Sequence, residues 1–302
     1  MKRKLLVISV LFALLFSLFT GCQPRFQPGT YTDDTGRTVA FDQVPRRLVS
    51  FGPSITEILF ALGLEESVVG VSSYCDYPEA AKSKAKVGDA FNPSLEKIVE
   101  LEPDLVLTVK QEQLQSELEA LGIRFLVLDP KDIDGILADI GLMGEITDTR
   151  SKAEALIGDM QSSISQVTLR AEDAPKVRVF YIVDATDPTL PWTAGSGSFI
   201  DALITLAGGE NIAGSAPGAW VSFSLEQIVS AEPEVIIVQT MTGGLPTISE
   251  EELEAGPVWG KMTAVAQSKI YLVDGDLVSR PGPRIVQGLE AIARAIHPEL
   301  FD

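Results

Sequence analysis

The stretch Ser94-Leu-Glu-Lys-Ile-Val-Glu-Leu-Glu-Pro103 occurs a second time in the chain, as Ser224-Leu-Glu-Gln-Ile-Val-Ser-Ala-Glu-Pro233. Seven of these ten positions are identical, at a separation of 130 residues. In each copy apolar residues at helical spacing precede a proline that ends the helix, and an apolar strand follows. Two copies are too few for a solenoid, so the repeat predicts one α/β domain plan that the chain uses twice.

Strand and helix signals alternate at short spacing around both copies. In the first half, strands are expected at 48–51, 67–71, 105–108 and 125–128, with helices at 54–62, 95–101 and 112–121. In the second half, strands are expected at 177–183, 235–239 and 270–273, with helices at 198–206, 226–230 and 285–296. Ser54 and Glu57 have the spacing of a capping box at the start of their helix. Such alternation is typical of a parallel sheet that is covered by helices.

Between the two halves the pattern changes from residue 133 to about residue 171. Apolar residues recur there at helical spacing, and no strand signal interrupts them. About 40 helical residues would reach about 60 Å if continuous, at about 1.5 Å per residue, and we expect a break near Asp148. The fold class is therefore α/β, with two Rossmann-like lobes at 46–131 and 173–302. Their parallel sheets are expected to be joined by a long rigid helix at 132–172.

The N-terminus has the layout of a secretory signal. Met1-Lys-Arg-Lys4 is basic, the following fifteen residues form an almost unbroken apolar run, and Thr20-Gly-Cys22 closes the segment. This apolar run is too short and wrongly flanked for a membrane-spanning helix. Because the cysteine directly after glycine resembles the lipobox of bacterial lipoproteins, we expect a signal peptide at 1–21 and lipid on Cys22. Residues 22–45 then form the lipid-attached tether and the approach to the first lobe. An ordinary cleaved signal or an uncleaved anchor is the alternative.

The mature chain is strongly acidic. The net charge is −18, and without the signal cations Lys2, Arg3 and Lys4 it is 21 basic against 42 acidic residues, or −21. Such a surface repels nucleic acid and anionic lipid headgroups, and it suits docking onto a basic protein surface. Once Cys22 is modified only Cys75 remains, so no intramolecular disulfide is expected.

The sequence offers few residues suited to catalysis or metal binding. His297 is the only histidine, so a His-based metal cluster or a catalytic Ser–His pair is not expected. The glycine patterns that hold phosphate groups are also missing. We therefore expect no enzyme activity and no resident cofactor. An exported enzyme on the same scaffold, or a zinc or manganese binding protein, remains the rival hypothesis.

Large aromatic side chains gather in loops that are expected to follow strands. In open α/β sheets, ligands bind at the loops beyond the carboxyl ends of the strands. Aromatic rings offer flat apolar area there at low entropic cost. Partial burial under its own loop is the alternative for any single ring. The residues are Tyr74, Tyr77, Phe91, Trp192, Trp220 and Phe223.

Glu96 and Glu226 hold equivalent positions in the two copies of the repeat. Each follows Ser-Leu at an expected helix N-terminus, where a carboxylate stabilises the helix by about 0.3–1 kcal/mol. Helix stabilisation alone is therefore one explanation. A matched pair, one in each lobe, also predicts two equivalent contact points for a partner with two-fold symmetry.

These motifs resemble a known family. From about residue 32 to its end, the chain is similar to the helical-backbone class (class III) of ABC-importer substrate-binding proteins, which serve cobalamin, haem and ferric siderophores. The likeness rests on the phrase from Leu95 to Val106 and on three further stretches, 69–78, 208–212 and 297–301. It implies an extracytoplasmic lipoprotein that delivers a metal-chelate nutrient to an ABC permease dimer through Glu96 and Glu226.

Within that class, Ser73-Tyr-Cys-Asp-Tyr-Pro78 looks most like the cobalamin-binding members. The resemblance implies that the ligand is cobalamin or a related corrinoid. The residues that it assigns to the ligand site are Tyr74, Phe91, Trp192, Trp220 and Arg280. Four positions depart from the best-known cobalamin binder by lacking its aromatic residues, and they are Ala90, Val109, Leu277 and Val278. Haem or a ferric siderophore therefore stays open as the ligand.

Overall fold

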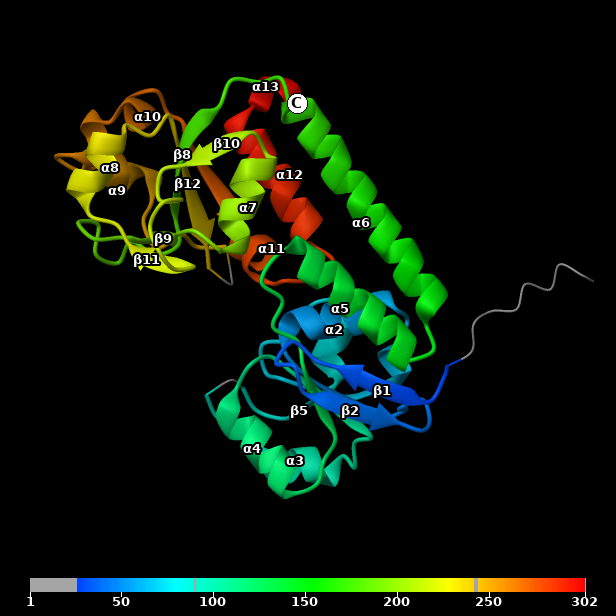
Figure 1. Ribbon diagram of the computed structural model, residues 1–302. Helices are drawn as coiled ribbons and strands as arrows, with labels where there is room; N and C mark the ends of the chain where they lie inside the picture. The colour runs from blue at the N-terminus through cyan, green and yellow to red at the C-terminus, as the bar shows by residue number, and fades with distance from the viewer. Residues whose placement is uncertain (1–25, 90, 242–243, 302) are drawn as a thin grey trace, which may run out of the picture.

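The computed structural model describes residues 26–89, 91–241 and 244–301, which form two α/β lobes (Figure 1). The first lobe has a five-stranded parallel sheet in the order β5-β4-β3-β6-β7. The second has a four-stranded parallel sheet in the order β10-β8-β12-β13. The strands are β3 (Leu48–Phe51), β4 (Val68–Val71), β5 (Ala85–Lys86), β6 (Leu105–Thr108), β7 (Phe125–Val127), β8 (Val177–Ile182), β10 (Gly209–Asn211), β12 (Val235–Thr240) and β13 (Ile270–Asp274). The expected α/β class with parallel sheets is confirmed.

Helices cover both faces of each sheet. In β3, Leu48 packs into the core shared with the connecting helices, whereas Val49 packs into a second core beneath α3 and α4. This alternation follows from the two-residue period of a strand. The first lobe contains α2 (Pro53–Ala61), η2 (Glu65–Ser67), η3 (Glu79–Ser83), α3 (Leu95–Glu100) and α4 (Glu112–Ala120). The second contains α7 (Phe199–Leu206), α8 (Leu225–Ala231), α9 (Glu250–Ala255), η4 (Trp259–Lys261), α10 (Thr263–Ala266), α11 (Gly275–Ser279), α12 (Ile285–Ile296) and α13 (Pro298–Phe301).

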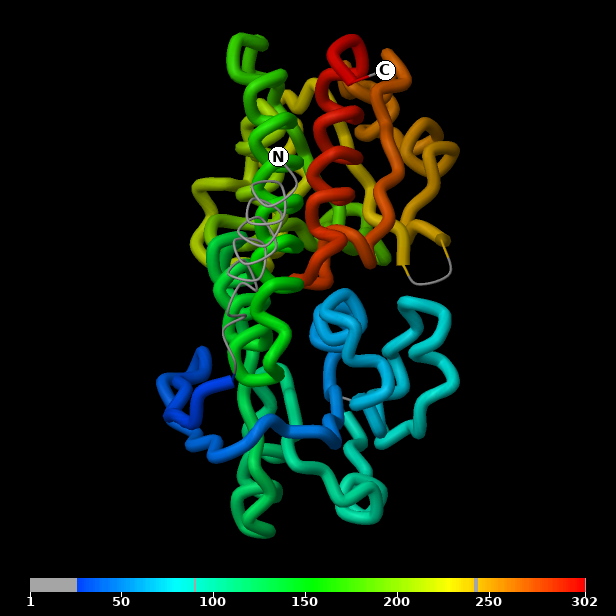
Figure 2. Tube along the Cα trace, turned by 90° about the vertical axis from the view of Figure 1, so that its right-hand side faces the viewer, coloured from blue at the N-terminus to red at the C-terminus, as the bar shows by residue number. Residues whose placement is uncertain are grey.

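Two helices, α5 (Ile133–Ile146) and α6 (Arg150–Ala171), connect the lobes. The expected break is confirmed, because Asp148 lies between them with a positive φ of 60°. The chain reverses direction there, and α6 runs back along the second lobe beside α12 and α7 (Figures 1 and 2). Its 22 residues correspond to about 33 Å at about 1.5 Å per residue. The connector is therefore two helices rather than one continuous rod, and α6 is the longer of them.

The sequence repeat is also a structural repeat. Glu102 and Glu232, which follow α3 and α8, share a left-handed backbone with φ of 45° and 49°. The Arg47 guanidinium donates from Nε to the Glu102 carbonyl at 3.0 Å, and Arg178 donates to the Glu232 carbonyl at 2.9 Å. Carbonyl groups at a helix end have no hydrogen-bond partner within the helix, and in both lobes a guanidinium group donates the missing hydrogen bond. Each of the two helices is thus held to its sheet in the same way.

The segment before the first lobe departs from the expected tether. Strand β1 (Gly29–Thr32) pairs with β2 (Thr38–Phe41) as an antiparallel hairpin. The Asp33 carboxylate accepts from the N–H of Thr35 and Arg37 within the turn, and from the N–H of Val127 in β7 at 3.1 Å. These hydrogen bonds attach the hairpin to the sheet, so the segment is folded from Gly29 onward. Cys22 and the signal segment lie outside the described residues.

Within the described residues, no helix has the length and apolar character needed to cross a membrane.

Helix α5 contains a buried carboxyl group, that of Asp139, which is 3% exposed. Burial, together with the nearby carboxylates of Asp34 and Asp129, raises the pKa of Asp139 to about 8. A carboxyl group with a raised folded-state pKa binds a proton more tightly in the folded chain than in the unfolded chain.

We expect Asp139→Asn to stabilise the protein increasingly as the pH rises from about 4 to about 8. In that window the parent must keep a proton or bury a charge, so its free energy of unfolding falls with pH, whereas asparagine does not titrate. At pH 7.5 the gain should reach at least about 1.4 kcal/mol, the equivalent of one pKa unit. Thermal unfolding of both proteins across this range checks it. The exposed Asp159→Asn on α6 is the matched control, and a gain that does not depend on pH would contradict the prediction.

Candidate ligand-binding cleft

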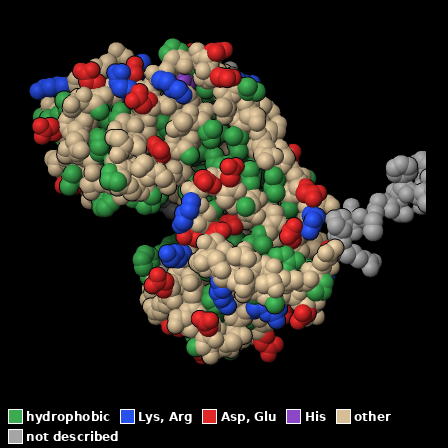
Figure 3. Space-filling view, in the orientation of Figure 1, with side chains coloured by type: hydrophobic (Ala, Val, Ile, Leu, Met, Phe, Trp, Pro, Cys, Tyr) green, Lys and Arg blue, Asp and Glu red, His purple; other side chains and the backbone are tan. Residues whose placement is uncertain are grey.

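Five large aromatic side chains are exposed in loops or short strands near the carboxyl ends of the two sheets, the edges at which open α/β sheets bind ligands. From the first lobe come Tyr74 (54% exposed), Tyr77 (45%) and Phe91 (84%). From the second come Trp192 (49%) and Trp220 (48%). Figure 3 shows a hollow between the lobes on this side of the molecule. The four aromatic residues expected to line the ligand site are therefore accessible.

Trp192 and Trp220 lie together on a small ribbon that the sequence did not reveal. Strand β9 (Trp192–Ala194) pairs antiparallel with β11 (Trp220–Ser222), so that Trp220 faces Ala194 and Trp192 faces Ser222. Residues that face each other across a pair share one side of it, as do residues two apart in a strand. Both tryptophans therefore project from the same side. Their separation in sequence gave no signal for this pairing.

In the loop after β4, Tyr74 is exposed whereas its neighbour Cys75 is buried. The Cys75 side chain is 1% exposed, and its Sγ lies 3.1 Å from the hydroxyls of both Thr56 and Ser72. Its thiol is a packed, hydrogen-bonded part of the interior.

Phe223 is also buried, with its ring centroid 6.0 Å from that of Phe180. The interpretation of Phe223 as a cleft residue is therefore wrong.

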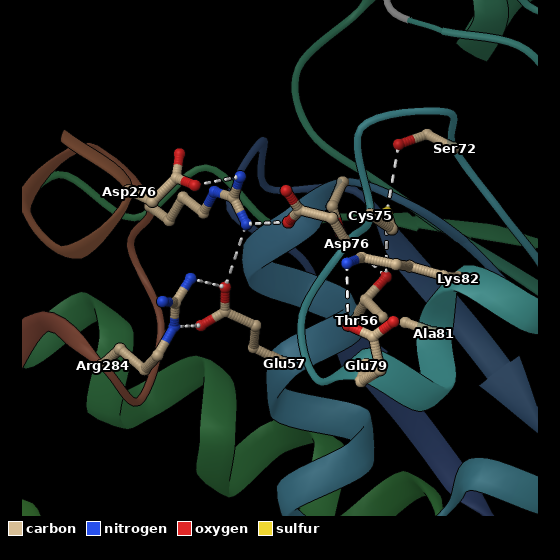
Figure 4. Close-up of polar contacts among 12 residues, drawn as sticks. Thr56, Glu57, Ser72, Cys75, Asp76, Glu79, Ala81, Lys82, Asp276 and Arg284 are labelled. Carbon is tan, nitrogen blue, oxygen red and sulfur yellow. Dashed lines mark hydrogen bonds and ion pairs between the residues drawn. The ribbon is translucent and has the colours of Figure 1, made fainter. Parts of the chain in front are cut away.

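Arg280 does not stand free in the cleft but belongs to an ion cluster between the lobes. Figure 4 shows the other members of this cluster, Glu57, Asp76, Asp276 and Arg284. The Arg280 guanidinium lies 2.6 Å from Asp76 Oδ1, 2.8 Å from Asp276 Oδ2 and 3.5 Å from Glu57 Oε1. Burial is the largest single effect and would raise the pKa of Asp76, but the hydrogen bond from Arg280 and the charges of Arg280 and Arg284 together outweigh it, so the pKa lies below its ordinary value. Burial raises the pKa of Asp276 in spite of the same arginine.

Arg284 completes the cluster and was missed by the sequence reasoning. It donates to both oxygens of Glu57, from Nε at 2.9 Å and from Nη2 at 2.6 Å, and its Cζ lies 4.0 Å from the centroid of the Tyr77 ring. This forked geometry is the strong form of a carboxylate–arginine pair. The expected capping box is wrong, because α2 begins after Gly52 without a side-chain cap and Glu57 turns to the second lobe.

Glu96 and Glu226 lie at the first turns of α3 and α8, and both are exposed. The two helices occupy the outer parts of the two lobes in Figure 1. Next to the carboxylates, Val99 is 47% and Val229 43% exposed at the same position of the repeat. Each lobe therefore presents an acidic and an apolar side chain on an equivalent helix.

Nothing in the described residues groups three or more histidine, cysteine or acidic side chains as a metal site. His297 is 2% exposed at the end of α12, far from any such role.

The chain is similar to proteins that are named for binding. It is 32% identical over 282 residues to YvrC of Bacillus subtilis (strain 168), described as an uncharacterized ABC transporter substrate-binding lipoprotein, covering 91% of this chain and 87% of that protein. It is 30% identical over 254 residues to the vitamin B12-binding protein of Pectobacterium carotovorum subsp. carotovorum (strain PC1), covering 82% and 87%. The apo structure of the periplasmic heme-binding protein RhuT from Roseiflexus sp. RS-1 matches with a TM-score of 0.73 at 26% identity, covering 84% and 99%.

Residues 48–277 match the family described as periplasmic binding protein, a span that runs from β3 in the first lobe through the connecting helices to α11 in the second. The two lobes, their parallel sheets and the helix between them agree with that match and with the resemblance seen in the motifs. This chain belongs to the periplasmic binding protein family.

Proposed function

We propose that this protein is the substrate-binding lipoprotein of an ABC importer and that it captures cobalamin or a related corrinoid. The observation that carries the proposal is the set of half-exposed aromatic side chains from both lobes, Tyr74, Trp192 and Trp220 above all. Exposed apolar rings at a strand edge are costly to keep in water, and a flat ligand between the lobes would cover them.

A corrin ring suits such walls because it is large and flat and has apolar faces. Covering about 100 Å² of apolar surface contributes about 2.5 kcal/mol, so contact with both tryptophans would supply a useful part of a tight binding energy. The macrocycle also carries its own cobalt ligands. The similarity to a vitamin B12-binding protein supports the same ligand class.

Haem is the second candidate, supported by the similarity to a heme-binding protein and by the flatness that haem shares with a corrin. Ferric siderophores are the third. The experiment that separates them is incubation of the purified protein with cyanocobalamin, haemin and a ferric hydroxamate in turn, followed by gel filtration. The visible spectrum of the protein fraction identifies the ligand. Loss of all three colours from the protein would contradict the proposal.

Trp220→Ala should weaken corrinoid binding by roughly 1 kcal/mol or more, because a large aromatic contact is lost. That corresponds to about a five-fold or larger rise in Kd. Quenching of the remaining tryptophan fluorescence measures the Kd. Leu169→Ala removes another exposed apolar side chain, from α6 and away from the cleft, and should leave the Kd unchanged. Equal affinity of a folded Trp220→Ala protein and its parent would remove Trp220 from the site.

Delivery is proposed to run through Glu96 and Glu226, each meeting a basic side chain of a two-fold permease. A hydrogen bond to a charged partner contributes about 1.5–3 kcal/mol, and contacts on separate lobes should act independently. We expect Glu96→Ala or Glu226→Ala to impair uptake and the double variant to abolish it, while ligand affinity in solution stays unchanged. Transport assays and Kd values check this. Glu154→Ala, on the exposed face of α6, is the control, and full transport by the double variant would refute the docking role.

Anchoring is proposed to depend on lipid attached to Cys22. Cys22→Ser should then release the protein from the membrane without any change in ligand affinity, because the cysteine precedes the folded lobes. Fractionation of cells into membrane and soluble material, with ligand titration of the released protein, checks the expectation. If the variant still sediments with membranes, an uncleaved anchor explains the attachment better.

A further inference from the structure

The ion cluster between the lobes contains more carboxylates than guanidinium groups. Glu57, Asp76 and Asp276 surround Arg280 and Arg284, so three carboxylates face two guanidinium groups. Figure 3 shows acidic and basic side chains gathered where the two lobes meet. When all five groups are ionised, the cluster has a net charge of −1.

Neither arginine is available to an anionic ligand. The side chains of Arg280 and Arg284 are only 10% and 13% exposed, and both guanidinium groups are already hydrogen bonded within the cluster. If one of them turned to a ligand carboxylate, it would weaken its contact with Glu57, which is 3% exposed. A buried carboxylate without its partner is strongly destabilising. Both guanidinium groups therefore stay paired with carboxylates of the cluster.

The loops that carry the aromatic residues add further negative charge. Asp89 precedes Phe91 and accepts its backbone N–H at 2.8 Å. On the second lobe, the backbone of Asp184 pairs with that of Trp192 at 2.7 Å. The Asp184 carboxylate accepts the backbone N–H of Thr186 at 3.0 Å, so both carboxylates are held by backbone donors of their own loops. A ligand seated on the rings would lie in a negative potential.

We infer that this cleft discriminates among flat metal chelates by the charge of their rim, preferring an uncharged, amide-bearing rim to one that carries carboxylates. The inference rests on the proposed function and deepens it. An amide rim can donate N–H groups to the carboxylates of the cleft, whereas a ligand carboxylate can only accept and is repelled. The same chemistry favours a corrinoid with amide side chains over haem with its two propionates.

A matched pair of ligands tests this directly. Dicyanocobinamide and dicyanocobyrinic acid share the corrin ring and the metal, but the first has an amide rim and the second a carboxylate rim. At pH 7.5 and low salt, we expect the parent protein to bind dicyanocobinamide at least tenfold more tightly by fluorescence titration. The ratio of the two Kd values should shrink as salt is raised toward physiological strength and beyond, because screening weakens repulsion between charges.

Asp276→Asn supplies the second arm of the test. It brings the cluster to neutrality while Arg280 keeps Asp76 and Glu57 as partners. We expect the ratio of Kd values to fall severalfold in this variant and to stay at the parental value in Asp159→Asn, which removes a charge from α6. Circular dichroism confirms that each variant is folded.

The outcomes separate the two proposals. Equal or tighter binding of dicyanocobyrinic acid or haemin by the parent overturns the charge inference and leaves metal-chelate capture standing. A ratio that is unchanged in Asp276→Asn, with the fold intact, also overturns it. If neither corrinoid and no haemin binds at all, the proposed function itself fails.

Discussion

The pairing of Glu57 with Arg284 and Arg280 holds the first lobe to the second at the floor of the cleft. On the opposite side, the lobes share the core that packs around α5 and α6. Because Glu57 is buried, its charge must stay paired, and the forked geometry with Arg284 allows little change in orientation. This pairing therefore limits how far the two lobes can move relative to each other.

The same rigidity extends outward to the helices that carry Glu96 and Glu226. Arg47 and Arg178 tie the ends of these helices to the strands beneath them, so each helix moves with its own lobe. A partner that held both helices would grip the two lobes separately. Movement between the lobes would then strain the ion cluster and the core around α6, rather than the sheets. A packed connector and a paired charge favour small displacements, because neither deforms continuously.

Local sequence signals predicted those parts of the fold that depend on neighbours in the chain. The buried runs of β3 and β6, the periodicity of α12 and the break at Asp148 were all foreseen, since each is encoded within a few residues. The β9–β11 ribbon was not, because three-residue strands joined by a long loop leave no pattern. Glu57 was misread for a similar reason. Its spacing from Ser54 suits a cap, whereas its true partner Arg284 lies 227 residues away.

For the site, the resemblance identified rings that the structure does expose, but it could not tell which polar groups were already satisfied. Arg280 looked like a ligand contact, yet its donors are bound to protein carboxylates. The rings of Trp192 and Trp220, by contrast, remain half-exposed. In such a cleft the affinity should come chiefly from covering apolar area, since these rings are exposed to water. The ion cluster then determines which ligand is preferred, because it repels some ligands and accepts hydrogen bonds from others.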